Sequence, residues 1–167
     1  LRASGRRTGL YTSPHLLDLT ERFVIDGRPV TTDALVDVVA DLQAAIEGLG
    51  MLETPLTFFE VTTAAAFELF RRAGVEVGVV EVGLGGRLDA TNVVEPVITA
   101  IASIALDHER YLGSTLAGVA VEGVIGVRVA RVVGRPFLGY PKIVDHREHR
   151  RTRPLDRGGA RHFEIVR

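Results

Sequence analysis

The sequence predicts an α/β domain with a mainly parallel sheet flanked by helices. Residues 75–82 and 97–106 are almost continuously apolar, which is typical of strands buried on both faces of a parallel sheet. A helical pattern precedes the first of these strands, and strand–helix–strand alternation indicates this fold class. The chain has 167 residues, of which 46% are hydrophobic and 25% are charged, as in a globular domain.

A short strand and a hairpin open the chain. Residues 8–12 predict the strand, which ends at Ser13-Pro14 because a residue before proline disfavours the helical conformation. Asp26-Gly27 lies between two apolar runs and therefore predicts a hairpin within residues 22–30.

Two helices follow the hairpin. Thr31 or Thr32 can cap the first, in which the apolar residues from Leu35 to Ile46 recur at helical spacing until glycines end the pattern. The second helix covers residues 57–73 and ends in two arginines, which suit the negative end of a helix dipole.

The C-terminal part of the chain is less regular. A Gly-rich loop, residues 83–92, leads toward the second apolar strand, and a helix is expected around residues 114–122. Beyond that helix the chain is Arg-rich with little apolar period, although residues 127–134 can form a strand. We expect a partial domain over residues 1–125 and a disordered or non-native tail over residues 126–167.

Composition and charge exclude several classes of protein. The net charge of −1 argues against a nucleic-acid partner. No apolar run reaches the roughly 18–20 residues that span a bilayer, and the first residues lack the apolar stretch of a signal peptide. With no cysteine, disulfides and thiolate chemistry are excluded. These features predict a cytoplasmic protein with no nucleic-acid or membrane partner.

Polar residues follow three predicted strands, at the points where these strands end. Residues 12–15 follow the first strand, Glu81 and the loop 83–92 the second, and Asp107-His108 the third. Ligands of open α/β sheets bind beyond the carboxyl ends of the strands. The sequence therefore predicts a functional site at this edge of the sheet.

Glu81 is the most informative of these residues. A carboxylate near the end of a buried strand is costly unless it is paired or bound to a metal. Two interpretations stay open: an ion pair with Arg87, or a ligand of Mg²⁺, which favours one or two carboxylates beside phosphate oxygens.

The other candidates also have structural interpretations. Ser13 can be a turn or cap residue, His108 a structural histidine, and Asp89 the cap of a turn. Thr57 can be the N-cap of a helix, and Phe59 is either a core residue or a stacking wall for a flat ligand.

Five strings of the sequence together carry a family resemblance: GLYTSPHL (9–16), ERFVIDGRPV (21–30), LTFFEVTTAAAF (56–67), VVEVGLGGRLDATNVV (79–94) and SIALDHERYLGSTL (103–116). In this order and spacing they resemble the folylpolyglutamate synthase and dihydrofolate synthase family of the Mur-ligase superfamily. The resemblance covers roughly residues 1–122, and EVGLGGRLDATN is its most specific string. It implies an incomplete Mur-ligase-type central ATPase domain.

The resemblance also implies an ATP-dependent acid–amino-acid ligase. In the family, ATP phosphorylates a carboxylate of dihydropteroate or of a folate glutamyl chain. The amine of L-glutamate then attacks the acyl phosphate, and an amide forms. Mg²⁺ neutralises the charge that develops on the phosphates. Because the family is usually monomeric, a monomer is expected.

Particular residues take roles by this resemblance. The implied Mg²⁺ ligands are Ser13, Glu81 and His108, and the residues that would line the pterin pocket are Thr57, Phe59, Asp89 and Ala90. Residues 13–30 would form a mobile loop beside that pocket.

Three departures from the family predict that this chain is inactive alone. The phosphate loop of the form GTNGKGS is missing from the chain and is expected upstream of residue 1, and the C-terminal domain is missing as well. Gly123 stands where the family has a lysine that is carbamylated and ligates metal. A frameshift or deletion near residue 123 accounts for the lost lysine and the unpatterned tail. Loss of the strand that carries the phosphate loop predicts exposed sheet edges.

Two other interpretations of the whole chain stay open. One is a non-catalytic module that keeps a pterin or folate site. The other is a ligase of the same superfamily that acts on peptidoglycan precursors, against which the strings GLYTSPHL and LTFFEVTTAAAF favour the folate branch.

Overall fold

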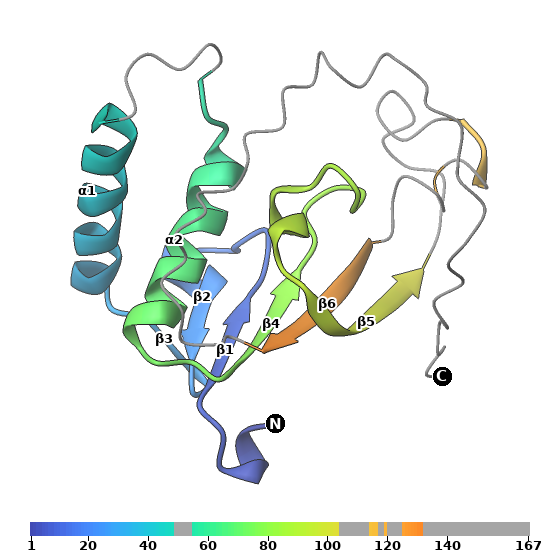
Figure 1. The fold of residues 1–167 in the computed structure, drawn as a ribbon, viewed down its shortest axis with the longest axis horizontal. Coiled ribbons are helices and arrows are strands. Elements are labelled where there is room, and N and C mark those ends of the chain that lie inside the picture. Colours follow the sequence, from blue (N-terminus) through green and yellow to red (C-terminus); the bar gives the residue numbers. More distant parts are fainter. Residues whose placement is uncertain (49–54, 104–113, 117–118, 120–124, 132–167) are drawn as a thin grey trace.

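The computed structural model describes residues 1–48, 55–103, 114–116, 119 and 125–131. Two helices and a six-stranded sheet form its framework, with three short 3₁₀ turns (Figure 1). The helices are α1 (Thr32–Gly48) and α2 (Phe58–Arg72); the strands are β1 (Thr8–Tyr11), β2 (Phe23–Ile25), β3 (Arg28–Pro29), β4 (Val77–Glu81), β5 (Pro96–Ser103) and β6 (Ile125–Arg131); the 3₁₀ turns are η1 (Arg2–Ser4), η2 (Leu19–Arg22) and η3 (Ala90–Val93).

The sheet is mixed, with strand order β3-β2-β1-β4-β6-β5. Only the β1–β4 pair is parallel among the described strands, so the expectation of a mainly parallel sheet was wrong. The physical reason is β6, which inserts between β4 and β5 and pairs antiparallel with both. Consequently β1, β4 and β5 still run in one direction, and their carboxyl ends lie at one edge of the sheet, as the sequence predicted (Figure 1).

Strand β6 lies where the sequence showed the least pattern. The boundary expected between residues 125 and 126 falls inside this strand, and the division into domain and tail stays a prediction. Leu116 and Val119 are helical, in agreement with the helix expected there. Asp107, His108 and Gly123 lie outside the described residues.

The helices begin where the sequence predicted, because their caps are present. The Thr31 hydroxyl accepts the N–H of Ala34 at 3.2 Å at the start of α1. At the start of α2, Thr57 accepts the N–H of Glu60, whose carboxylate in turn accepts the Thr57 N–H at 2.7 Å. This reciprocal pair satisfies two donors that the first helical turn leaves free.

The core lies between the helices and the first strands. Helix α1 packs on α2, and α2 packs on β1 and β2. Tyr11, Phe23, Val38 and Phe70 are almost completely buried there. A Cβ on Gly9 of β1 would lie 2.6 Å from the Phe70 ring, so the ring rests directly on the strand backbone.

Strand β5 was expected to be buried on both faces, and this expectation was wrong. Residues 96–101 of the strand are all exposed, and Val97 and Ile98 are 63% and 61% exposed. The strand pairs with β6 alone among the described strands, and neither α1 nor α2 packs extensively on it, so its apolar side chains stay uncovered in the described part of the chain. No helix in that part is long and apolar enough to cross a membrane.

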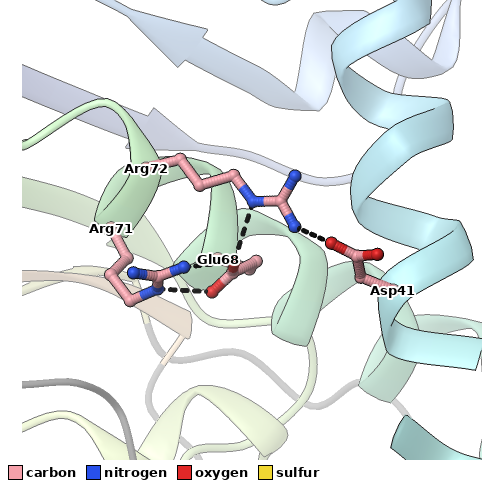
Figure 2. Close-up of polar contacts among 4 residues, drawn as sticks. All are labelled: Asp41, Glu68, Arg71 and Arg72. Carbon is pink, nitrogen blue, oxygen red and sulfur yellow. Dashed lines mark hydrogen bonds and ion pairs between the residues drawn. The ribbon is translucent and has the colours of Figure 1, made fainter. Parts of the chain in front are cut away.

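An ion-pair cluster joins the C-terminal turn of α2 to α1 (Figure 2). The Glu68 carboxylate accepts hydrogen bonds from Arg71 Nε at 2.7 Å and from Arg72 Nε at 2.8 Å, and Arg72 also pairs with Asp41 of α1. Hydrogen bonds from Arg71, reinforced by Arg72, lower the pKa of Glu68 from 4.5 to about 2. The arginines thus serve both the helix dipole and the α1–α2 contact.

The lowered pKa of Glu68 predicts a pH dependence of stability. A carboxyl group whose pKa falls on folding contributes stability above its unfolded pKa and loses that contribution as the pH falls through its folded pKa. We therefore expect Glu68→Gln to destabilise the chain at pH 7, with a difference from wild type that shrinks between pH 4.5 and about 2. Urea unfolding of both chains across this pH range measures the difference, and a constant difference would contradict the assignment.

Candidate active site at the carboxyl edge of the sheet

Ser13 and Glu81 meet where β1 and β4 end. The Ser13 backbone N–H donates to Glu81 Oε2 at 2.7 Å, across the parallel pair that places Tyr11 beside Val80. Glu81 is half-buried, and this hydrogen bond holds one of its carboxylate oxygens at the rim of the sheet. The structure thus brings together two of the three predicted metal ligands.

The residues at this rim fit a magnesium ion by their chemistry. A carboxylate and a hydroxyl are hard oxygen donors of the kind that Mg²⁺ takes, usually alongside water and phosphate oxygens. His108, the third predicted ligand, lies outside the described residues. Within the described ranges, no three Asp, Glu or His side chains lie close enough together to hold a metal ion by themselves. Water or phosphate oxygens would have to complete the coordination.

Asp89 folds the Gly-rich loop that follows β4. Its Oδ2 accepts the backbone N–H groups of Gly83 at 3.1 Å and Leu84 at 2.9 Å, and its Oδ1 accepts that of Thr91 at 2.9 Å. The side chain also accepts a hydrogen bond from the Thr91 hydroxyl. Asp89 therefore acts as the turn cap, and Ala90 begins the 3₁₀ turn η3 beside it.

Arg128 of β6 holds the same loop, a role that was not predicted from the sequence. Its Nη2 donates to the carbonyl of Gly86 at 2.9 Å, and its Nη1 donates to Asn92 Oδ1 at 2.7 Å. Burial lowers the pKa of Arg128, against a smaller opposite effect of Asp89. The sequence sign of such a role was an arginine within the apolar stretch of residues 127–131. Its partners, Gly86 and Asn92, could not be predicted, because they depend on the long-range pairing of β6.

Phe59 forms the wall between α2 and the loop. Its ring centroid lies 6.0 Å from that of Tyr11, and a Cβ on Gly83 would lie 2.5 Å from the ring. The loop backbone therefore rests against the ring edge as only glycine allows. Thr57, at the start of the same helix, uses its hydroxyl in the cap with Glu60.

A second aromatic contact fixes the segment after Ser13. Arg22, which is 7% exposed, donates from Nε to His15 Nδ1 at 2.8 Å and lies 5.3 Å from the centroid of the Phe58 ring. This contact connects the chain after the cis Ser13–Pro14 bond to the start of α2. His15 belongs to residues 12–15, which the sequence placed at the functional site, whereas Arg22 and Phe58 were given no site role of their own.

Known proteins resemble this chain in sequence. A probable bifunctional folylpolyglutamate synthase/dihydropteroate synthase of Haloferax volcanii is 48% identical over 120 residues, which are 72% of this chain and 14% of that protein. The folylpolyglutamate synthase of Lacticaseibacillus casei is 43% identical over 122 residues, which are 72% of this chain and 28% of that enzyme.

A solved structure matches the fold as well. A folylpolyglutamate synthase in complex with AMPPCP and folate superposes with a TM-score of 0.68 and 43% identity, over 72% of this chain and 30% of that one. The chain carries a segment of the folylpolyglutamate synthase/dihydrofolate synthase family. The predicted family and the partial Mur-ligase-type α/β domain are thereby confirmed.

The segment is a minor part of the family's length. The chain spans between about one seventh and one third of the relatives that it matches. No protein-family model matches the chain. The activity and substrates of the complete synthases are therefore a matter of proposal for this chain.

Proposed function

We propose that this chain carries the pterin and metal edge of an ATP-dependent ligase that joins L-glutamate to dihydropteroate or folate. The observation that carries the proposal is the convergence of Ser13, Glu81 and the Phe59–Gly83 contact at one edge of the sheet. The relative from Lacticaseibacillus casei is a synthase of this kind, and a folylpolyglutamate synthase was solved with folate and a nucleotide analogue. The same proposal takes the protein to be a monomer that acts in the cytoplasm.

Each residue has a role in this proposal. Ser13, Glu81 and His108 would hold Mg²⁺, which supplies neutralising charge for the phosphates of ATP and of the acyl phosphate. Phe59 would stack on the flat pterin ring, and Thr57 would border it at the start of α2. Asp89 would act through the backbone, because it holds the loop that includes Ala90 in the shape that faces the ring.

We further propose that the chain does not ligate glutamate by itself. The sequence contains no phosphate loop of the GTNGKGS form, and Gly123 cannot be carbamylated where the family uses a lysine. ATP phosphates would thus lack the backbone N–H cradle that normally orients them. Incubation with ATP, Mg²⁺, glutamate and dihydropteroate should release no ADP above background. Glutamate-dependent ADP release would contradict this part of the proposal.

The alternative, a pterin-binding remnant without turnover, has support from the same geometry. Phe59 and the loop backbone do not depend on ATP, since both are held by contacts within residues 11–92. Binding of dihydropteroate together with a lack of ADP release would identify this alternative as the function of the isolated chain.

Replacement of Phe59 tests the proposed stacking wall. We expect Phe59→Ala to raise the Kd for dihydropteroate by about 10-fold or more, because loss of one ring-stacking contact costs roughly 1–3 kcal/mol. Phe59→Leu, which keeps apolar bulk, should lose most of the same affinity while it preserves the fold. The measurement is a fluorescence titration with the pterin as its own reporter.

Phe58 provides the matched control for Phe59. It is the neighbouring phenyl ring, 58% exposed, and it contacts Arg22. Phe58→Ala should change the Kd by less than about 3-fold, since an exposed ring beside the site adds little desolvated contact. Equal losses in both variants would place the pterin elsewhere.

A further inference from the structure

A basic hollow lies at the opposite end of the sheet from the proposed active site. Its volume is about 550 Å³, and it is a shallow depression that opens widely to solvent. In Figure 1 this end of the molecule is the one where the N-terminus lies and β1 begins. The lining residues are Arg2, Gly5, Arg6, Arg7, Asp26 and Arg28.

Two of the four arginines have acidic partners. Arg6 Nη1 lies 3.6 Å from Glu76 Oε1, and Arg7 Nε lies 3.6 Å from Asp26 Oδ2. The same two carboxylates accept backbone N–H groups, Asp26 from Thr8 at 2.8 Å and Glu76 from Arg7 at 2.9 Å. Each carboxylate therefore interacts both with an arginine and with a backbone N–H group at the start of β1.

Arg2 and Arg28 face the same hollow without such compensation. No carboxylate pairs with either within the part of the chain that the structure describes. Arg2 reaches from η1 to the β2–β3 turn, where a Cβ on Gly27 would collide with its guanidinium. Gly27 has φ +80°, so the turn both requires glycine and leaves room for the arginine. Four guanidinium groups therefore face two carboxylates, which leaves a surplus of two positive charges.

We propose that this hollow binds an oligophosphate anion through Arg2 and Arg28. Arginine presents a planar fork of donors that matches phosphate oxygens in pairs. An anion with two or more linked phosphates carries enough negative charge to balance the two surplus positive charges. Its linked phosphates can also engage both Arg2 on η1 and Arg28 on β3. The site is independent of the proposed ligase function, because it lies at the amino ends of β1 and β4, away from Glu81.

Calorimetric titration of the whole chain with inorganic triphosphate, at low salt and without divalent cations, tests the proposal. We expect one triphosphate per chain. The double variant Arg2→Gln/Arg28→Gln should weaken binding by at least about 10-fold, because a charge-assisted hydrogen bond contributes about that factor or more. Arg2→Lys/Arg28→Lys, which keeps the charge, should recover part of the affinity and shows that the fold is intact.

The control removes two charges elsewhere. Arg71→Gln/Arg72→Gln on α2 loses arginines that Glu68 and Asp41 already engage, and it should change the affinity by less than about 3-fold. Equal weakening in both double variants would show general charge attraction and overturn the proposal, as would failure of the wild-type chain to bind triphosphate.

Further ligands distinguish the source of the phosphates. ATP should bind about as tightly as triphosphate, and adenosine should not bind, because only phosphate is recognised. A tenfold preference for ATP would overturn recognition of phosphate alone. Glu81→Gln removes a negative charge at the carboxyl edge and should leave triphosphate binding unchanged if the anion sits in the hollow. Tighter binding in this variant would place the anion at the carboxyl edge instead and overturn the proposal.

Discussion

Glu81→Gln is expected to lower the affinity of the chain for divalent cations by about 10-fold or more, because Mg²⁺ sites rest on one or two carboxylates. The substitution is nearly isosteric. The amide oxygen of the glutamine can still accept the Ser13 N–H that now lies 2.7 Å from the carboxylate, so the strand ends should stay in place. The loss would therefore report on charge rather than on folding. Paramagnetic broadening by Mn²⁺, competed with Mg²⁺, measures the affinity at this edge.

Glu76 provides a matched control at the other end of the same strand. Its carboxylate also accepts a backbone N–H, that of Arg7 at 2.9 Å, but it faces arginines rather than Ser13. Glu76→Gln should leave cation affinity unchanged within about 2-fold, since the neighbouring positive charges already disfavour a cation there. If both variants lost affinity equally, Glu81 would not be the metal ligand.

Phe70→Ala should destabilise the chain severely. Removal of a buried phenyl ring costs about 3–5 kcal/mol, which is a large part of the roughly 5–15 kcal/mol that stabilises a typical domain. Phe70 is 1% exposed, and its ring lies against the backbone of Gly9 at the centre of the packing between α2 and β1. Little rearrangement can fill the cavity, because the strand beneath it is held by β2 and β4.

Urea unfolding followed by circular dichroism measures this loss. Val36→Ala on α1 is the control, since that side chain is 59% exposed and should change the free energy of unfolding by less than about 0.5 kcal/mol. A loss below about 1 kcal/mol in Phe70→Ala would contradict the close packing of the ring on β1.

The sequence predicted the elements whose signals are local. Helix α2 begins at its Thr57 cap and ends at its arginine pair as expected, and Asp26-Gly27 makes the turn between β2 and β3. Apolar period, caps and turn residues act over a few positions, so one sequence suffices to read them. The sequence also predicted that the first, second and third apolar strands, β1, β4 and β5, end on the same side of the sheet. Ser13 and Glu81 meet there as a result.

The features that the sequence did not predict depend on contacts between distant segments. The pairing of β6 with β4 joins residues about 50 positions apart, and no local pattern indicates which strand inserts between two others. The burial of Arg128 follows from that insertion, whereas Val97 and Ile98 are exposed because neither α1 nor α2 packs extensively on β5. Asp89 was predicted both as a turn cap and as a pocket residue; its hydrogen bonds establish the first role, and the second stays a prediction.

The most direct test of the central claim is to locate a bound pterin on the chain. Amide chemical shifts of the ¹⁵N-labelled protein, recorded during titration with dihydropteroate, report each residue separately. We predict that the shifts concentrate at Ser13, Phe59, Gly83 and Thr91, at the carboxyl edge of the sheet. The amides around Thr8 at the amino edge should not move. A folded chain whose spectrum is unchanged by dihydropteroate, or changes only at the amino edge, would contradict the account.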